Sequence, residues 1–242
     1  EQPPTEPESW QEIFASLEEI VLNGSTHWNH PLFFAHHPVA CCYPSILGDI
    51  LSSGIGTVGF SWMSGPSLTE LEMTTLDWLV DLLGLPEHFK NFHPGIGSSL
   101  IQTTAGEATL TAIITARATA VEAIKNEGTS YLPNPYVKST IKEILDKVRQ
   151  NTAHPFLEKA VMLNAVKLRK LKCSIHPEMK NYTVMRETLE EAIKEDRERG
   201  LIPFLMIASM GTKKTCSFDR LDDLGPVCYR ERIYLHVDAA YG

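Results

Sequence analysis

The stretch IYLHVDAAYG, residues 233–242, decides the fold. Ile233, Leu235 and Val237 lie among apolar or aromatic neighbours, which predicts a strand buried on both faces of a parallel sheet. The strand ends in Asp238, two small residues and a tyrosine. Because ligands of open α/β sheets bind beyond the carboxyl ends of the strands, this carboxylate could face a cation or a protonated ring nitrogen. An aspartate that starts a turn or caps the next helix explains the residues equally well.

Upstream of this strand, the first part of the chain predicts three helices. Ser9 and Glu12 form a capping box that opens an amphipathic helix ending near Gly24. A second helix begins at Tyr43, and a third, over residues 68–83, has Thr69 as its predicted cap. Leucines at helical spacing predict the buried face of this third helix. They are Leu68, Leu71, Leu76, Leu79, Leu82 and Leu83.

The middle of the chain carries a possible anion site. Residues 100–102 predict a short strand, and small or hydroxyl residues from Thr103 to Thr109 then enter an Ala-rich helix running to about Asn126. Free N–H groups at such a helix start favour an anion, so a phosphate site is one interpretation. Ordinary helix capping is the alternative, and these residues by themselves favour it.

The second half alternates helices with strands. Residues 155–166 and 221–230 predict helices, and residues 183–199 predict an acidic, solvated helix. Residues 166–173 predict a basic strand and residues 203–209 a buried one, whereas the charged segment 145–150 is a poor strand. This alternation is typical of a parallel α/β sheet.

The composition excludes several classes of function. The chain of 242 residues has a net charge of −8 and a pI of about 5.6. Because it contains no basic run, we expect no nucleic-acid partner. Its apolar stretches are too short for a membrane span and no signal peptide opens it, so we expect no membrane contact. Five cysteines without metal-type spacing favour a reduced, cytoplasmic protein.

The histidine-rich stretch 27–38 allows two interpretations. His27, His30, His36 and His37 could ligate a metal, since imidazole is a common ligand. No carboxylate or cysteine spacing accompanies them, and this histidine spacing is a weak signal. We therefore favour an aromatic loop that lines a pocket, and we predict no metal.

Several strings occur along the chain in one order and at consistent spacing. They are HWNHPLFFAHHP, GFSWMSGPSLTELEMTTLDWL, LGLPEHF, EAT, AHPFLEKA, GLIPFLMIASMGT, CSFD and HVDAAYG. In these strings the chain resembles the pyridoxal-phosphate (PLP) dependent group II decarboxylases, of the aromatic L-amino acid and histidine decarboxylase type. The resemblance implies an α/β architecture of the fold type I PLP-dependent transferase kind, with a mostly parallel sheet and flanking helices. It also implies a homodimer, an N-terminal helical arm over residues 1–42 and a PLP-binding domain over residues 43–242.

The resemblance implies roles for individual residues. Asp238 matches the aspartate that pairs with the protonated pyridine nitrogen, which makes the ring an electron sink after loss of CO2. Ala240 matches the small residue under one ring face, and His154 matches the histidine that stacks on the other face and moves protons. The phosphate cradle and the remaining cofactor contact match Thr104, Ala105, Gly106 and Ser209. The substrate-pocket loop matches Trp28, His36, His37, Pro38 and Val39.

The chain also departs from the family. The motif with the Schiff-base lysine would follow Gly242, and the chain starts without methionine, so we expect a fragment or a truncated product. Substitutions near ligand positions include Val39, Gly106 and the pair Lys213-Lys214. Two functions remain open: decarboxylation of an amino acid substrate of the dopa, 5-hydroxytryptophan or histidine type, or an inactive truncated paralogue that serves as a dimerisation partner.

Overall fold

The computed structural model describes residues 5–35, 41–128, 148–151, 160, 162–212 and 215–241. It divides into two compact units, Glu1–Gly56 and Thr57–Gly242. The predicted division into an N-terminal arm (residues 1–42) and a PLP-binding domain (residues 43–242) stays a prediction. The two compact units are described separately below.

The first unit consists of helices with exposed side chains. Helix α1 (Trp10–Leu17) has the predicted capping box, in which Ser9 and Glu12 exchange hydrogen bonds, and it continues into the π-helical turn η1 (Glu18–Leu22). Helix α2 (Tyr43–Ile55) begins where the sequence predicts it and ends at Gly56, whose φ of +64° is easily adopted by glycine. Among the described residues, none in α1, η1 or α2 is buried.

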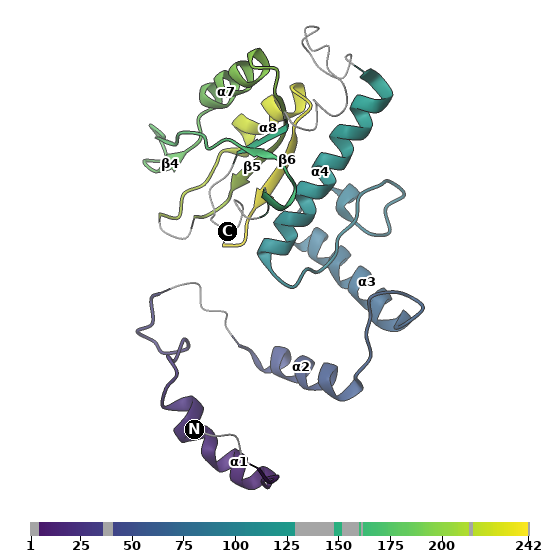
Figure 1. Cartoon of the computed structure of the whole chain (residues 1–242), viewed down its shortest axis with the longest axis vertical. Helices are drawn as coiled ribbons and strands as arrows, with labels where there is room; N and C mark the ends of the chain where they lie inside the picture. Colours follow the sequence, from purple (N-terminus) through teal and green to yellow (C-terminus); the bar gives the residue numbers. More distant parts are fainter. Residues whose placement is uncertain are drawn as a thin grey trace. The chain divides into compact units, whose positions relative to one another are not determined.

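The second unit contains a parallel sheet (Figure 1). Its strands are β1 (Val148–Asn151), β2 (Lys167–Leu168), β5 (Ile202–Ser209) and β6 (Tyr234–Asp238), in the order β2-β1-β5-β6 with every pairing parallel. The α/β class is therefore confirmed. The charged segment before residue 151 forms β1 despite its composition, since its backbone pairs on both sides, with β2 and with β5.

Strands β5 and β6 differ in burial. In β5, Phe204 and Met206 are each 1% exposed, and burial of such a side chain contributes roughly 1.5–3 kcal/mol. The prediction that the last strand is buried on both faces is wrong, because no residue of β6 is fully buried. The strand lies at the edge of the described sheet. Its residues are half-buried, and Tyr234 is exposed.

Helices α4 (Ala105–Glu127), α7 (Arg186–Glu198) and α8 (Leu221–Arg230) pack on this sheet and form two apolar cores with it (Figure 1). Helix α4 contributes Ile113, Ala116 and Ala120 to one apolar core with β5. Helices α7 and α8 form a second core around Met206. The predicted bounds of α8 are confirmed, whereas α7 is less solvated than predicted because Leu189, Ala192, Ile193 and Asp196 are buried. The predicted strand over residues 166–173 is reduced to β2.

A short antiparallel hairpin precedes α7. It joins β3 (Ser174–Ile175) to β4 (Tyr182–Thr183). His176 is buried in its turn, where Nδ1 accepts the N–H groups of Glu178 and Met179. The turn is therefore closed by its own side chain.

Helix α3 (Pro66–Leu82) differs from its prediction. It begins after Gly65, so Thr69 lies inside the helix and its hydroxyl donates to the Gly65 carbonyl at 2.9 Å. The leucine stripe is not buried: Leu71, Leu79, Leu82 and Leu83 are 44–81% exposed. The buried residues of α3 are instead Thr69, Asp77 and Val80. Asp77 is buried because its carboxylate accepts backbone N–H groups from the segment after η2 (Glu87–Phe89).

The predicted strand at residues 100–102 is absent from this described segment. Ile101 N–H instead donates to Glu72 Oε1 at 2.9 Å, so a side chain of α3 takes the place of a neighbouring strand. As for membranes, none of the described helices combines the length and apolar character needed to cross one.

Candidate functional site

The start of α4 offers hydrogen-bond donors. Thr104 is the N-cap, and its Oγ1 accepts the N–H of Glu107 at 3.1 Å. Ala105 and Gly106 occupy the first helical positions, where N–H groups have no acceptor within the helix. The helix dipole adds partial positive charge there. The segment can therefore hold an anion.

The direction of α4 is fixed by contacts at its other end. Glu127, its last residue, forms a two-pronged ion pair with Arg232, which lies two residues before β6, with N–O distances of 2.6 and 2.8 Å. Ile124 packs on Ile202 at the start of β5. Since the C-terminal end of α4 lies where the strands begin, its N-terminal end lies toward the edge where β5 and β6 end (Figure 1).

Asp238 is the last residue of β6 and lies in register with Ser209, the last residue of β5. Its backbone carbonyl accepts the N–H of Met210 at 2.8 Å, and its Oδ1 accepts the N–H of Ala240 at 3.2 Å. Among the described residues, no basic side chain forms an ion pair with Asp238. The carboxylate therefore has bonding capacity left for a cationic or protonated ligand.

Sequence reasoning missed Asp219. Its Oδ2 accepts the N–H of Ser209 at 2.9 Å and its Oδ1 accepts the N–H of Val184 at 2.9 Å. The hydroxyl of Thr183 donates to the same Oδ1 at 3.3 Å. The string CSFD contains this residue, but a string does not show that an aspartate holds two backbone segments together.

Two titratable groups lie next to Asp238 in the sequence. Burial lowers the pKa of His236, and the charge of Asp238 opposes that shift. The Cys216 thiol donates to the hydroxyl of Tyr241 at 3.6 Å and raises the pKa of that phenol. Cys216 has a φ of +47°, a conformation that non-glycine residues rarely adopt.

A cavity of about 240 Å³ lies beside the end of β5. It extends under the β3–β4 hairpin, and Ser209 and Asp219 form part of its wall. Other wall residues are Cys173, Tyr182 and Ser217. The end of β5 therefore borders open space as well as β6.

The predicted site residues fall into three groups. Those at the carboxyl edge of the sheet are Thr104, Ala105, Gly106, Ser209, Asp238 and Ala240. Trp28 belongs to the first unit, where its ring stacks on Phe33 with centroids 5.5 Å apart. The described ranges do not include His36, His37, Pro38, Val39 or His154. Within those ranges, no cluster of three or more histidine, cysteine or acidic side chains could hold a metal ion.

Comparisons with known families match the chain as a whole. The model of the pyridoxal-dependent decarboxylase conserved domain matches residues 1–242. The chain belongs to this family. It is 40% identical to histidine decarboxylase of Mus musculus over 239 residues, and 42% identical to aromatic-L-amino-acid decarboxylase of Manduca sexta over 244 residues. These alignments cover 98% and 100% of the chain, but 35% and 46% of the relatives.

Solved structures agree with this placement. Catharanthus roseus tryptophan decarboxylase in complex with L-tryptophan is 28% identical, with a TM-score of 0.83. Oryza sativa TDC with PLP and tryptamine is 30% identical, with a TM-score of 0.84. The matches cover 100% and 99% of this chain but 48% and 47% of those chains. The chain thus spans about half the length of these structures or less.

The residues at the edge of the sheet fit PLP, the cofactor of the family. An acid with bonding capacity suits a protonated ring nitrogen, and free N–H groups at a helix start suit a phosphate. Ala240 is small enough to lie against a ring face. The cofactor expected from the sequence is confirmed for the family, while the contacts of single residues stay predictions.

Proposed function

We propose that the protein is a PLP-dependent carboxy-lyase that converts an aromatic L-amino acid or histidine into its amine and CO2. The observation that carries this proposal is the placement of Asp238 at the end of β6, in register with Ser209 and on the edge toward which α4 begins. The identities to histidine and aromatic-L-amino-acid decarboxylases support the substrate class.

The start of α4 would bind the phosphate of PLP. The N–H groups of Ala105 and Gly106 and the hydroxyl of Thr104 supply the donors, and the helix dipole adds to their attraction. Gly106 donates through its backbone, so the lack of a side chain does not remove this contact.

Asp238 would hold a proton on the ring nitrogen of PLP. A carboxylate close to a ring nitrogen favours the charged pyridinium form. When bound, PLP accepts the electrons that the departing CO2 leaves behind. Ala240 would lie against one ring face, His154 would stack on the other, and Ser209 would contact the cofactor from β5.

His154 would also move a proton near the reacting carbon, because imidazole titrates near neutral pH. The loop with Trp28, His36, His37, Pro38 and Val39 would line the substrate pocket. Dopa, 5-hydroxytryptophan, tryptophan and histidine are the candidate substrates.

We propose further that the protein works as a homodimer. Apolar side chains on α1 and α2 support this proposal, since Trp10, Phe14 and Leu51 are 62–70% exposed. Light scattering measures the mass directly. A monomer at micromolar concentration would contradict this part of the proposal.

The activity is tested by incubating the protein with PLP and each of the four candidate amino acids, labelled at the carboxyl carbon. Release of labelled CO2 from at least one of them is expected. The matched variants are Asp238→Asn, which should abolish most of the release, and Glu191→Gln, which changes an exposed acid on α7 and should not. A protein that binds PLP but releases no CO2 would support the inactive alternative.

A further inference from the structure

We propose that Asp219 is a positioning residue that fixes the end of β5 and thereby the orientation of Asp238. This inference rests on the proposed function, because it concerns the acid that would hold the ring nitrogen of PLP. Asp219 itself need not touch the cofactor.

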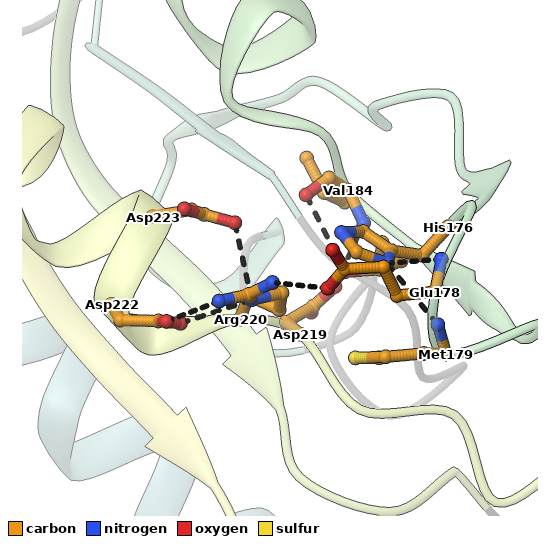
Figure 2. A network of polar contacts seen from close by, with 9 residues as sticks. His176, Glu178, Met179, Val184, Asp219, Arg220, Asp222 and Asp223 are labelled. Atoms are coloured by element: carbon orange, nitrogen blue, oxygen red, sulfur yellow. Dashed lines mark hydrogen bonds and ion pairs between the residues drawn. The ribbon is translucent and has the colours of Figure 1, made fainter.

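The contacts of Asp219 form a clamp between chain segments. Ser209 and Asp219 exchange backbone and side-chain hydrogen bonds: the Ser209 N–H donates to Oδ2, and the Asp219 N–H donates to the Ser209 carbonyl, both at 2.9 Å. The other carboxylate oxygen accepts the N–H of Val184, directly after β4 (Figure 2). One carboxylate therefore connects the end of β5 with the hairpin.

The effect of the clamp can reach Asp238 through two short steps. Ser209 and Asp238 are register partners in the parallel pair β5–β6. The next residue, Met210, donates its N–H to the carbonyl of Asp238 at 2.8 Å. Because the end of β6 is hydrogen-bonded to the end of β5, a displacement of Ser209 moves the backbone that carries the Asp238 carboxylate.

The neighbour of Asp219 is also anchored. Arg220 pairs with Asp222 and Asp223 in the first turn of α8 and lies 3.8 Å from Glu178 in the hairpin turn (Figure 2). Ser217 donates to Asn181 in the same turn at 3.0 Å. Residues on both sides of Asp219 are thus tied to the same hairpin, which leaves the carboxylate little freedom to move.

The chemistry of the clamp requires two acceptor oxygens. A carboxylate accepts hydrogen bonds at both oxygens, whereas an asparagine amide has one acceptor and one donor group. In Asp219→Asn, the N–H of either Ser209 or Val184 therefore faces a donor and loses its partner. The substitution changes hydrogen bonding with almost no change in volume.

The experiment compares Asp219→Asn with Glu191→Gln, which neutralises an exposed acid on α7, in the whole protein. Hydrogen exchange without cofactor measures the clamp alone, and we expect exchange about tenfold faster in residues 205–210 and 234–238 of Asp219→Asn. With PLP added, we expect about tenfold weaker binding of PLP. We also expect a lower pH midpoint for the absorbance change of bound PLP, because a displaced Asp238 stabilises the pyridinium less. Glu191→Gln should match the wild type in all three measurements.

Separate outcomes overturn separate claims. Unchanged exchange in residues 234–238 of Asp219→Asn would overturn the link to β6. Faster exchange with unchanged PLP affinity and unchanged midpoint would reduce Asp219 to a structural residue. If Asp219→Asn does not fold, Asp219→Glu takes its place. Glutamate keeps both acceptor oxygens but displaces them by one methylene group, so the same changes in hydrogen exchange, PLP affinity and pH midpoint are expected. Failure of the wild type to bind PLP would instead overturn the proposed function.

Discussion

The segments around Asp219 and Asp238 both present an aspartate near the carboxyl end of β5, but their hydrogen bonding differs. Asp219 accepts hydrogen bonds at both oxygens, from Ser209 and from Val184 and Thr183. From the described residues, the carboxylate of Asp238 accepts one hydrogen bond, from Ala240, at a single oxygen. The first carboxylate is occupied by its own chain, while the second can accept more.

This difference indicates how an acid at a ligand edge is assigned. An acid whose oxygens are used by backbone N–H groups stabilises the fold, and its loss leaves donors unpaired. An acid with unused acceptors gains a partner only when a ligand arrives. The two aspartates should therefore respond differently to substitution. Loss of Asp219 should lower stability together with PLP binding, whereas loss of Asp238 should lower catalysis with little change in stability.

The largest effect is expected from Asp238→Asn. If Asp238 holds the proton on the ring nitrogen, decarboxylation should slow by about 100-fold or more, as when a preorganised electrostatic group is removed. The free energy of unfolding should change by less than about 0.5 kcal/mol, because asparagine can still accept the Ala240 N–H. Turnover assays and urea titrations measure the two quantities. Near-normal turnover would refute the assignment.

The second largest effect is expected from Asp219→Ala. Two backbone N–H groups lose their acceptor, so the free energy of unfolding should fall by about 3 kcal/mol. Urea titration measures the change, with Glu191→Ala on α7 as the exposed control. Equal stabilities of the two alanine variants would remove the distinction between a structural acid and a surface acid.

A smaller effect is expected at the start of α4. Thr104→Val removes the hydroxyl that caps Glu107 N–H and should cost about 1 kcal/mol of stability. It should also weaken PLP binding, whereas Thr104→Ser should retain both properties. Thermal unfolding and PLP titration are the measurements. If Val and Ser behave alike, the hydroxyl has no role at this helix start.

The smallest effect is expected from His236, because the nearby Asp238 charge partly offsets the effect of burial. The pKa of His236 lies below its usual 6.5 in the folded chain, so the unfolded chain binds more protons between these two values. Its contribution to stability is therefore complete above pH 6.5 and is lost as pH falls through the folded pKa. Urea titrations from about pH 5 to about pH 8 should show a flatter profile for His236→Gln than for the wild type. Parallel profiles would contradict this expectation.

Several helices and strands, and one residue of the candidate site, could be predicted from the sequence. Local signals predict the capping box at Ser9 and the strand that ends at Ser209. They also predict helix α8 with its observed bounds. Asp238 was singled out because strand ends in parallel sheets are where ligands bind. Such signals depend on neighbouring residues, so a single sequence contains them.

Other features depend on partners far away in the chain. The leucine pattern of α3 marks an apolar face but does not say what covers it, and Asp77 is buried only because it binds distant backbone N–H groups. The N–H of Ile101 donates to the side chain of Glu72 instead of to the carbonyl of a neighbouring strand. The hydrogen bonds of Asp219 join residues up to 36 positions apart, which periodicity does not reveal.

The outer side of β6 has a practical consequence. In the described sheet β6 is an edge strand, so half of its backbone N–H and C=O groups, from Tyr234 to Asp238, have no strand partner there. Such an edge can add a strand from another molecule. A lysine introduced at the exposed Tyr234 should oppose such pairing, and sedimentation of concentrated samples of the two proteins would measure the difference.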